Sequence, residues 1–389
     1  MNEAESERIA AFLEKKGYRP VKDKYKADLV VINTCSVRES AENRVFGLIN
    51  NLTKWKAKIL ATSHQPPATS KNNLQRAASH VPRAIVTGCM LGSALGKRKR
   101  YALKQLKKKL PGVKLIPLEK LLKGFKDKPK RKKKKTALVP IMKGCNNFCT
   151  YCVVPYARGK EVSRPFEEIV CEVKALVKDG YEEVMLLGQN VNSYQKNKKF
   201  PIRLLPEKGP AASTFRHVAY GASKTQNYKT PFAQILVALN EIKGLKKIKF
   251  MTSNPWDLTD DIIEALKLPK VDRYLHLPVQ SGNDEILRKM NRKYTAKEYL
   301  ALIKKVRKAV PDIKIGTDII VGFPGETNEQ FENTVKLCKK AGFSVAYIAK
   351  YSPRPGTAAF KLEDNVAMEE KKRRWRVLEK LINKERTSQ

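Results

Sequence analysis

Three cysteines fall within eight residues near the middle of the 389-residue chain, in the stretch KGCNNFCTYC. Cys145, Cys149 and Cys152 follow the spacing Cys-x3-Cys-x2-Cys, and no fourth cysteine or histidine lies close to them in the sequence. Structural zinc sites usually take four ligands arranged in pairs. Three thiolates suit a [4Fe-4S] cluster whose fourth iron stays open for a substrate or cofactor. A zinc ion with a remote fourth ligand is the alternative.

The remaining cysteines and the apolar patterning place limits on the class of protein. Cys171 and Cys338 lie on the apolar faces of predicted helices, which indicates core residues. Seven clustered cysteines argue against a secreted disulfide framework and favour a reducing cytoplasm. The sequence has no apolar run long enough for a membrane helix, and the charged N-terminus does not resemble a secretory signal.

The charge of the chain is strongly positive. Lysine and arginine number 79 against 38 aspartate and glutamate residues, which gives a formal net charge of +41. Such an excess favours polyanionic partners, with nucleic acid first and an anionic membrane surface second. Lysine-rich, solvated helix faces are the plainer explanation of the same number.

Strands and helices alternate in the first third of the chain. Apolar spacing predicts helices over 3–16 and 38–52 and another around Leu103, Leu106 and Leu110, with strands over 27–33 and 84–88. This order predicts a small parallel α/β domain over residues 1–127. The basic run 128–135 then predicts a linker, whose Lys132 and Lys133 are candidate RNA contacts.

A longer alternating series follows over residues 136–365. The predicted helices cover 165–179, 259–267, 295–309 and 326–341, and the predicted strands cover 136–142, 182–188, 246–251, 272–276, 313–321 and 344–350. Six strands with intervening helices predict a partial (β/α)6 barrel, with the cysteine loop at the carboxyl rim of the first strand. Two segments without apolar period, 61–83 and about 203–229, are predicted to be long loops or insertions.

The cysteine loop resembles a known signature. With the aromatic Tyr151 before the last cysteine, it is similar to the loop of the radical S-adenosylmethionine (SAM) superfamily. That resemblance implies that the amino and carboxylate groups of SAM chelate the open iron. It also implies that an electron from the cluster cleaves SAM to a 5′-deoxyadenosyl radical, which abstracts hydrogen, so that the cofactor does the difficult chemistry.

Further stretches resemble the methylthiotransferases within that superfamily: MNEAESER (1–8), NTCSVRE (33–39), TGCM (87–90), PYARGKEVSRP (155–165), LGQNVNSY (187–194), LHLPVQSGN (275–283), TDIIVGFPGET (317–327) and YSPRPGT (351–357). These motifs are most similar to those of the branch that methylthiolates isopentenyl-adenosine beside the tRNA anticodon. Two other branches modify threonylcarbamoyl-adenosine at the same place or an aspartate of a ribosomal protein. A non-catalytic, basic RNA-binding protein with a structural metal site is an alternative of another class.

The resemblance also implies a second [4Fe-4S] cluster, which carries the sulfur and is held in the N-terminal domain. The family uses three cysteines there, and this chain offers Cys35 and Cys89. We expect the third to lie upstream of a start codon that was placed too late. The family's C-terminal β-barrel, which binds tRNA, is expected to be absent, with residues 366–389 forming a C-terminal helix.

Other roles are implied by the same resemblance. The predicted SAM contacts are Tyr151, Gln189, Asn190, Thr252, Ser253, Gln280, Ser281 and Asp318. Arg158 and Arg164 are candidate phosphate contacts, whereas Phe323–Thr327 could be a turn and helix N-cap only. The expected partners are a tRNA anticodon stem-loop, whose unstacked bases are accessible, and an electron donor such as a flavodoxin or ferredoxin. We expect a cytoplasmic monomer that does not bind membranes.

Overall fold

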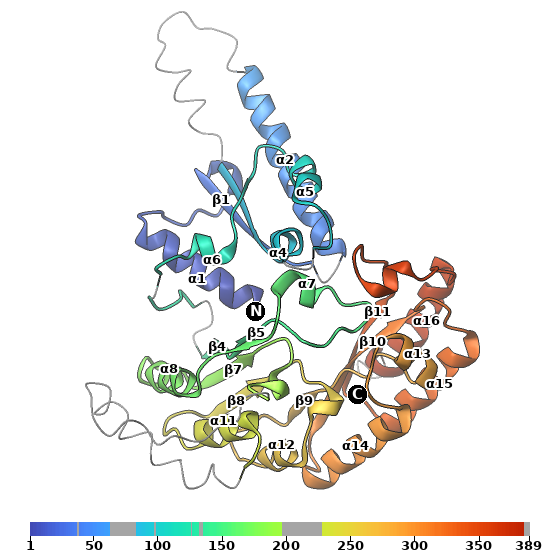
Figure 1. The fold of residues 1–389 in the computed structure, drawn as a ribbon. Coiled ribbons are helices and arrows are strands. Elements are labelled where there is room, and N and C mark those ends of the chain that lie inside the picture. Colours follow the sequence, from blue (N-terminus) through green and yellow to red (C-terminus); the bar gives the residue numbers. More distant parts are fainter. Residues whose placement is uncertain are drawn as a thin grey trace, which may run out of the picture. The chain divides into compact units, whose positions relative to one another are not determined.

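The computed structural model describes residues 1–36, 39–62, 83–96, 99–125, 127–131, 135–196 and 228–384. The chain divides into two compact units, each assembled from separate stretches (Figure 1). The first unit comprises Met1–Lys132, Tyr151–Lys160 and Arg354–Phe360, and the second comprises Lys133–Thr150, Glu161–Pro353 and Lys361–Gln389. The boundary between the units therefore falls within the cysteine loop. The segment up to Thr150 belongs to the second unit, and the segment from Tyr151 belongs to the first.

A three-stranded parallel sheet forms the centre of the first unit, in the order β1 (Leu29–Thr34), β2 (Arg83–Gly88) and β3 (Lys114–Leu115). Buried Val86, Met90 and Leu106 belong to its hydrophobic core. The helices of this unit are α1 (Asn2–Lys15), α2 (Glu39–Thr62), α4 (Cys89–Leu95), α5 (Leu103–Lys109), α6 (Leu118–Leu121) and α7 (Val154–Arg158), with the short 3-10 helix η1 (Lys24–Lys26). The predicted parallel α/β arrangement is confirmed.

Helix α2 is longer than the sequence pattern predicted. The prediction ended it at residue 52 and assigned an insertion from residue 61, but the helix runs to Thr62. Residues 53–62 contain neither glycine nor proline and several strong helix formers, so the helix can continue without an apolar stripe. The rest of that predicted insertion, residues 63–82, lies outside the described residues.

Six parallel strands form the second unit, as predicted. They are arranged as two sheets with the orders β4–β7–β8 and β11–β10–β9, and an isolated parallel bridge pairs Ile248 of β8 with Val271, just before β9. The strands are β4 (Thr136–Pro140), β7 (Glu183–Leu187), β8 (Lys247–Phe250), β9 (Tyr274–His276), β10 (Lys314–Val321) and β11 (Val345–Lys350). A small antiparallel pair, β5 (Met142–Lys143) with β6 (Val162–Ser163), was not predicted.

Helices pack along the strands of this unit (Figure 1). They are α8 (Phe166–Lys178), α11 (Pro231–Asn240), α12 (Asp260–Ala265), α13 (Asp284–Lys289), α14 (Ala296–Ala309), α15 (Asn328–Ala341) and α16 (Met368–Glu379), with the short helical turns η2 (Val191–Ser193), η4 (Pro255–Asp257), η5 (Ala358–Lys361) and η6 (Lys380–Lys384), of which η5 runs from one unit into the other.

Sequence reasoning missed α11 because it is apolar on nearly every side, so it lacks the periodicity that marks a surface helix. Most of the second predicted insertion, residues 203–227, lies outside the described residues. None of the described helices combines the length and the apolar character that crossing a membrane requires.

Candidate functional site

Cys145 and Cys149 lie in the loop that follows β5 in the second unit. Gly144 enters this loop with a φ of +77°, a conformation that glycine adopts without strain. Burial raises the pKa of the Cys145 thiol to about 11, and the Asn147 amide donates a hydrogen bond to its Sγ at 3.4 Å. A thiol in this environment needs a cationic partner or a metal to become a thiolate.

Backbone contacts fix the second half of the cysteine loop. The Thr150 hydroxyl donates to the Lys289 carbonyl at 2.8 Å, and Asn291 Nδ2 donates to the Phe148 carbonyl at 2.9 Å. Asn291 itself has a φ of +56°, in the left-handed region. The turn after α13 therefore holds the segment that carries Cys149.

Arg292 lies against Cys149 and was not identified from the sequence. Its Nη1 is 3.4 Å from Cys149 Sγ, and its guanidinium lies over the ring of Trp256, 4.6 Å from the centroid, and over that of Tyr294 at 5.3 Å. Two aromatic faces hold the cation beside the sulfur. This places a guanidinium in contact with the sulfur of a predicted iron ligand.

Cys152 follows three residues later, in the segment Tyr151–Lys160 that clusters with the first unit. Within the described residues, no group of three or more histidine, cysteine, aspartate or glutamate side chains is arranged to hold a metal ion. The assignment of Cys145, Cys149 and Cys152 to one cluster therefore stays a prediction from their spacing. Tyr151 is half-buried, and its SAM contact stays a prediction as well.

The end of β7 presents buried acceptors without donors. Asn190 is fully buried and donates through Nδ2 to Asp257 Oδ2 at 2.7 Å. Asn190 Oδ1 and Gln189 Oε1 are also buried, and neither has a hydrogen-bond partner in the described part of the chain. Buried polar atoms are nearly always paired, so two unpaired acceptors at one strand end fit a ligand that brings N–H or O–H donors.

Two other predicted SAM contacts have strained backbones. Thr252 and Gln280 have φ values of +68° and +70°, in the region that residues with a Cβ seldom adopt. Thr252 Oγ1 donates to the Gly188 carbonyl at 2.8 Å, and the Gln280 amide donates to the Asp318 carbonyl at 2.9 Å. Such strain is retained where the surrounding structure fixes it, commonly at ligand sites.

The hydroxyls of Ser253 and Ser281 are directed into the protein. Ser253 is 2% exposed and donates to the His276 carbonyl at 2.5 Å. Ser281 is fully buried, lies 3.4 Å from Thr334 Oγ1 and accepts from the Asn283 amide. These contacts give both serines a role in joining strand ends and helix starts, and their contact with SAM stays a prediction.

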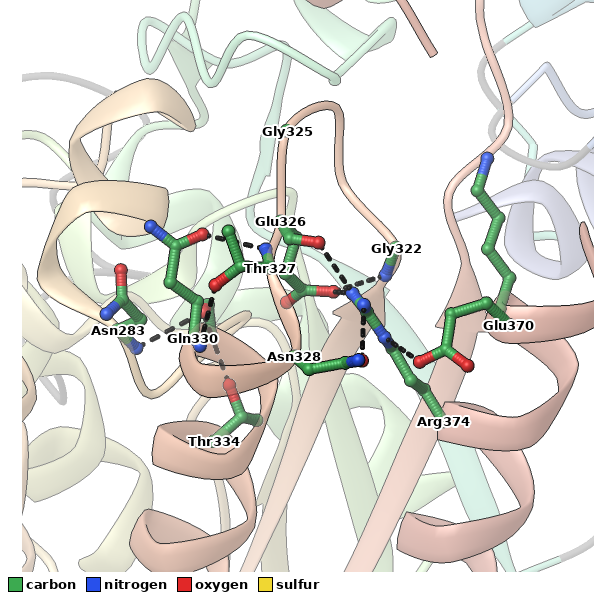
Figure 2. Close-up of polar contacts among 12 residues, drawn as sticks. Asn283, Gly322, Gly325, Glu326, Thr327, Asn328, Gln330, Thr334, Glu370 and Arg374 are labelled. Carbon is green, nitrogen blue, oxygen red and sulfur yellow. Dashed lines mark hydrogen bonds and ion pairs between the residues drawn. The ribbon is translucent and has the colours of Figure 1, made fainter. Parts of the chain in front are cut away.

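The loop Gly322–Thr327 after β10 is a turn that ends in a helix cap, as the sequence indicated. Thr327 Oγ1 accepts from the Gln330 amide, and the Gln330 side chain accepts from the Thr327 amide, which forms a capping box at the start of α15 (Figure 2). Glu326 turns back, and its carboxylate accepts from the Gly322 amide at 2.6 Å. Figure 2 shows Arg374 of α16 reaching the same carboxylate.

Cys35 and Cys89 come together in the first unit because of strand register. Thr34 of β1 pairs with Gly88 of β2, and each cysteine follows its strand by one residue. Burial raises the pKa of the Cys89 thiol. A Cβ on Gly88 would lie 2.5 Å from Asn33 Oδ1, so a side chain at this position would close the space between the two strand ends.

Three residues within two positions of these cysteines in the sequence carry buried oxygens without a hydrogen-bond partner among the described residues. Asn33 Oδ1, Ser36 Oγ and Thr87 Oγ1 are each next in sequence, or nearly so, to a predicted ligand. None of the three has a hydrogen-bond partner among the described residues. The thiol pair and these polar atoms fit an iron–sulfur cluster, with two of the three cysteines that the family resemblance implies.

Two buried arginines support the loop after Cys35. Arg354 donates to the Ser36 carbonyl at 2.6 Å and lies 3.0 Å from Glu42 Oε2, and Arg100 lies 3.5 Å from Glu42 Oε1. The two guanidinium side chains are 7% and 1% exposed. Because these charges are buried, removing any one of them would leave another buried charge without its partner and destabilise the fold.

Arg158, predicted to contact RNA, is an internal side chain of the first unit. Its side chain is 12% exposed, and the guanidinium donates to Glu5 Oε1 at 2.5 Å and to Asn2 Oδ1 at 2.6 Å. The structure therefore gives Arg158 a role in holding α1. Arg164 is 32% exposed and pairs with Glu172 at 2.7 Å. Lys132 and Lys133 lie outside the described residues.

Known proteins of one family are similar to this chain over nearly its whole length. Residues 139–338 match the model of the radical SAM superfamily, and residues 1–107 match the model of the uncharacterized protein family UPF0004. A tRNA-2-methylthio-N(6)-dimethylallyladenosine synthase of Clostridium botulinum strain Hall is 40% identical over 98% of this chain and 79% of its own length. The protein of the same name from Clostridium tetani is 38% identical, with 99% and 79% covered.

A solved structure has the same fold at low sequence identity. A radical S-adenosylmethionine methyltransferase from Kitasatospora setae, with cobalamin and a [4Fe-4S] cluster bound, matches with a TM-score of 0.50 and 12% identity. The match covers 91% of this chain and 73% of that structure.

Proposed function

Because this chain belongs to the family of tRNA-2-methylthio-N(6)-dimethylallyladenosine synthases within the radical SAM superfamily, we propose that it methylthiolates tRNA. The group is transferred to C2 of N6-isopentenyladenosine next to the anticodon, with SAM and two [4Fe-4S] clusters as cofactors. The observation that carries this proposal is 40% identity over 98% of the chain, which includes the three-cysteine loop.

The first cluster is held by Cys145, Cys149 and Cys152 in this proposal. When bound, such a cluster supplies the electron that cleaves SAM and starts hydrogen abstraction from the base. The protein's part is to bind and orient. Arg292, fixed beside Cys149 by Trp256 and Tyr294, balances thiolate charge, and the unpaired acceptors of Gln189 and Asn190 receive donors of SAM.

Cys35 and Cys89 hold the second cluster, which provides the sulfur. Their strand ends are adjacent through the Thr34–Gly88 pair. The Ser36 and Thr87 hydroxyls, buried without partners in the described residues, are available to the cluster's sulfides as weak donors. Arg100 and Arg354 keep positive charge close to the loop that carries Cys35, which offsets the negative charge of thiolates and sulfides.

The substrate is the anticodon stem-loop of a tRNA, whose unstacked bases can enter an enzyme site. A net charge of +41 favours the phosphate backbone and makes binding sensitive to salt. An electron donor such as a flavodoxin or ferredoxin reduces the first cluster. A cytoplasmic monomer fits these requirements.

Anaerobic reconstitution with iron and sulfide, followed by SAM, a reductant and isopentenylated tRNA, tests the proposal. We expect 5′-deoxyadenosine together with methylthio-isopentenyladenosine, detected by mass spectrometry of the tRNA nucleosides. Reconstituted protein that cleaves no SAM would refute the enzymatic function.

The target is tested in the cell that makes this protein. Deletion of the gene should remove methylthio-isopentenyladenosine from tRNA. An unchanged amount of that nucleoside, with loss of methylthio-threonylcarbamoyladenosine or of the ribosomal-protein modification, would assign the chain to one of the other branches.

A further inference from the structure

One face of the β9–β10–β11 sheet is polar and aromatic. Along β10, Ile319 is fully buried in the core, whereas its neighbour Asp318 has a side chain that is 40% exposed. Tyr274 and His276 of β9 and Tyr347 of β11 share the face of Asp318, since Gly316 pairs with His276 and Asp318 pairs with Tyr347. Figure 1 shows α14 and α15 packed beside these strands, and the apolar residues of β10 share a core with those helices.

A chain of hydrogen bonds crosses this face. The Tyr274 hydroxyl lies 3.2 Å from His276 Nδ1, and His276 Nε2 lies 3.1 Å from Asp318 Oδ2. With Asp318 ionised, its carboxylate can only accept, so His276 Nε2 donates to it and Nδ1 accepts from the phenol. Burial raises the pKa of Tyr274 to about 12, so the phenol remains a donor at neutral pH.

Gly316 makes room for this chain. A Cβ at residue 316 would lie 2.0 Å from the Tyr274 hydroxyl oxygen and 2.7 Å from Cζ of the same ring. Any other residue on β10 at this position would push the phenol away from His276. Glycine at position 316 therefore leaves the space on β10 that the Tyr274 ring occupies.

Only one of the two oxygens of the Asp318 carboxylate has a hydrogen bond within the described residues. Oδ2 is held by His276, and no hydrogen bond to Oδ1 is found among the described residues. The ring of Tyr347, 47% exposed, lies beside the imidazole at a centroid distance of 5.6 Å. A fixed, partly exposed carboxylate beside an aromatic ring favours a cationic ligand over an RNA phosphate.

We propose that Tyr274 and His276 are positioning residues that hold the Asp318 carboxylate in one orientation, so that its second oxygen accepts a hydrogen bond from SAM. This inference rests on the proposed function, since SAM is the cationic cofactor of that reaction. It goes beyond a contact by Asp318 because it assigns the orientation of that contact to two residues that need not touch the cofactor.

The test compares His276→Phe, His276→Gln and Tyr274→Phe in the reconstituted enzyme that contains all 389 residues. The dissociation constant of SAM is measured by equilibrium dialysis, and KM and kcat are measured from 5′-deoxyadenosine formation. We expect His276→Phe to raise both the dissociation constant and the KM for SAM about tenfold, and Tyr274→Phe about threefold, as loss of hydrogen bonds of ordinary strength predicts. The kcat should stay within about twofold.

A side-chain amide can replace one imidazole nitrogen, so His276→Gln should recover most of the affinity that His276→Phe loses. The matched control is Tyr299→Phe, whose hydroxyl donates to the Leu277 carbonyl at 2.7 Å and is fully buried, outside this chain of bonds. It should leave SAM binding unchanged. Gly316→Ala, which displaces the phenol, gives an independent route to the Tyr274→Phe result if His276→Phe does not fold.

Two results would overturn the inference. Variants of Tyr274 and His276 that bind SAM as the wild type does would refute it, and so would a rise in the KM for tRNA with the KM for SAM unchanged. Both require a wild-type enzyme that forms 5′-deoxyadenosine. A wild type that forms none refutes the proposed function itself, so the two failures are distinct.

Discussion

Arg374 Nη1 lies 2.8 Å from Glu326 Oε2, and the two side chains are only 4% and 1% exposed (Figure 2). The same nitrogen donates to the Glu326 carbonyl at 2.9 Å, and Arg374 Nε donates to Glu370 at 2.7 Å. Helix α16 is thereby fastened to the loop that follows β10. Burial raises the pKa of Glu326 even though Arg374 and the Gly322 amide oppose it, so the arginine is what makes the buried carboxylate tolerable.

Arg374→Met should lower the free energy of unfolding by about 3–5 kcal/mol, because it leaves Glu326 buried without its cation. Urea denaturation followed by circular dichroism measures the loss. Lys372→Met is the control on the same helix, since Lys372 pairs with Glu369 at 3.4 Å in solvent and should cost less than about 1 kcal/mol. Equal effects of the two substitutions would contradict the account.

The lowered pKa of Glu370 leads us to expect that the free energy of unfolding falls in acid. Hydrogen bonds from Arg373 lower the pKa of Glu370 from 4.5 to about 2. The folded state therefore binds this proton less tightly than the unfolded chain does, and the stability it contributes is complete above pH 4.5 and is lost as the pH falls towards 2. Comparing Glu370→Gln with the wild type by urea denaturation at stepped pH should show a difference that shrinks across that window. A difference independent of pH would be inconsistent with this pairing.

Cys149→Ala should remove the first cluster, which is roughly four iron atoms per chain. Iron and sulfide analysis after reconstitution, with the visible absorption of the cluster, measures this. Cys338→Ala is the control, because Cys338 is buried in the core of the second unit and burial raises its pKa to about 12. It should keep the full iron content. Loss of iron in both variants would show that folding, and not ligation, was affected.

Two helical glycines give opposite predictions. A Cβ on Gly92 of α4 would lie 2.0 Å from the Ala157 carbonyl oxygen of α7, whereas one on Gly47 of α2 meets nothing within 4 Å. Gly92→Ala should therefore lower the free energy of unfolding by about 1–3 kcal/mol through overpacking. Gly47→Ala should raise it by about 0.5–1 kcal/mol, since alanine loses less entropy in a helix. Thermal denaturation of both variants measures the sign, and a destabilised Gly47→Ala would be the contrary result.

The sequence predicted those features whose signal is local. Strand and helix patterns alternate along the second unit, and Thr327 followed by Gln330 has the spacing of a capping box. Cys35 and Cys89 are predicted ligands from the family motifs around them, and strand pairing places the ends of the two strands that precede them next to each other. Their binding of a cluster stays a prediction.

What could not be predicted depends on partners distant in the sequence. Arg292 is held beside Cys149 by Trp256 and Tyr294, and no spacing rule connects position 256 with position 149. Arg158 is a candidate phosphate contact by sequence, but in the structure its side chain is largely buried and forms an ion pair with Glu5. The two residues are 153 positions apart, so sequence spacing could not predict this pair. Only the tertiary fold determines whether an arginine faces RNA or another part of its own chain.

The contact between Arg354 and the Ser36 carbonyl spans 318 positions, and this bears on how the protein is made. Translation runs from the N-terminus at roughly 5–20 residues per second, so residue 354 follows residue 36 after about 15–60 s. The hydrogen bond from Arg354 to the Ser36 carbonyl, next to Cys35, cannot form until that segment has left the ribosome. We therefore expect the second cluster to be loaded after residue 354 has been made, and cells short of iron to accumulate a folded apoprotein that can still be filled.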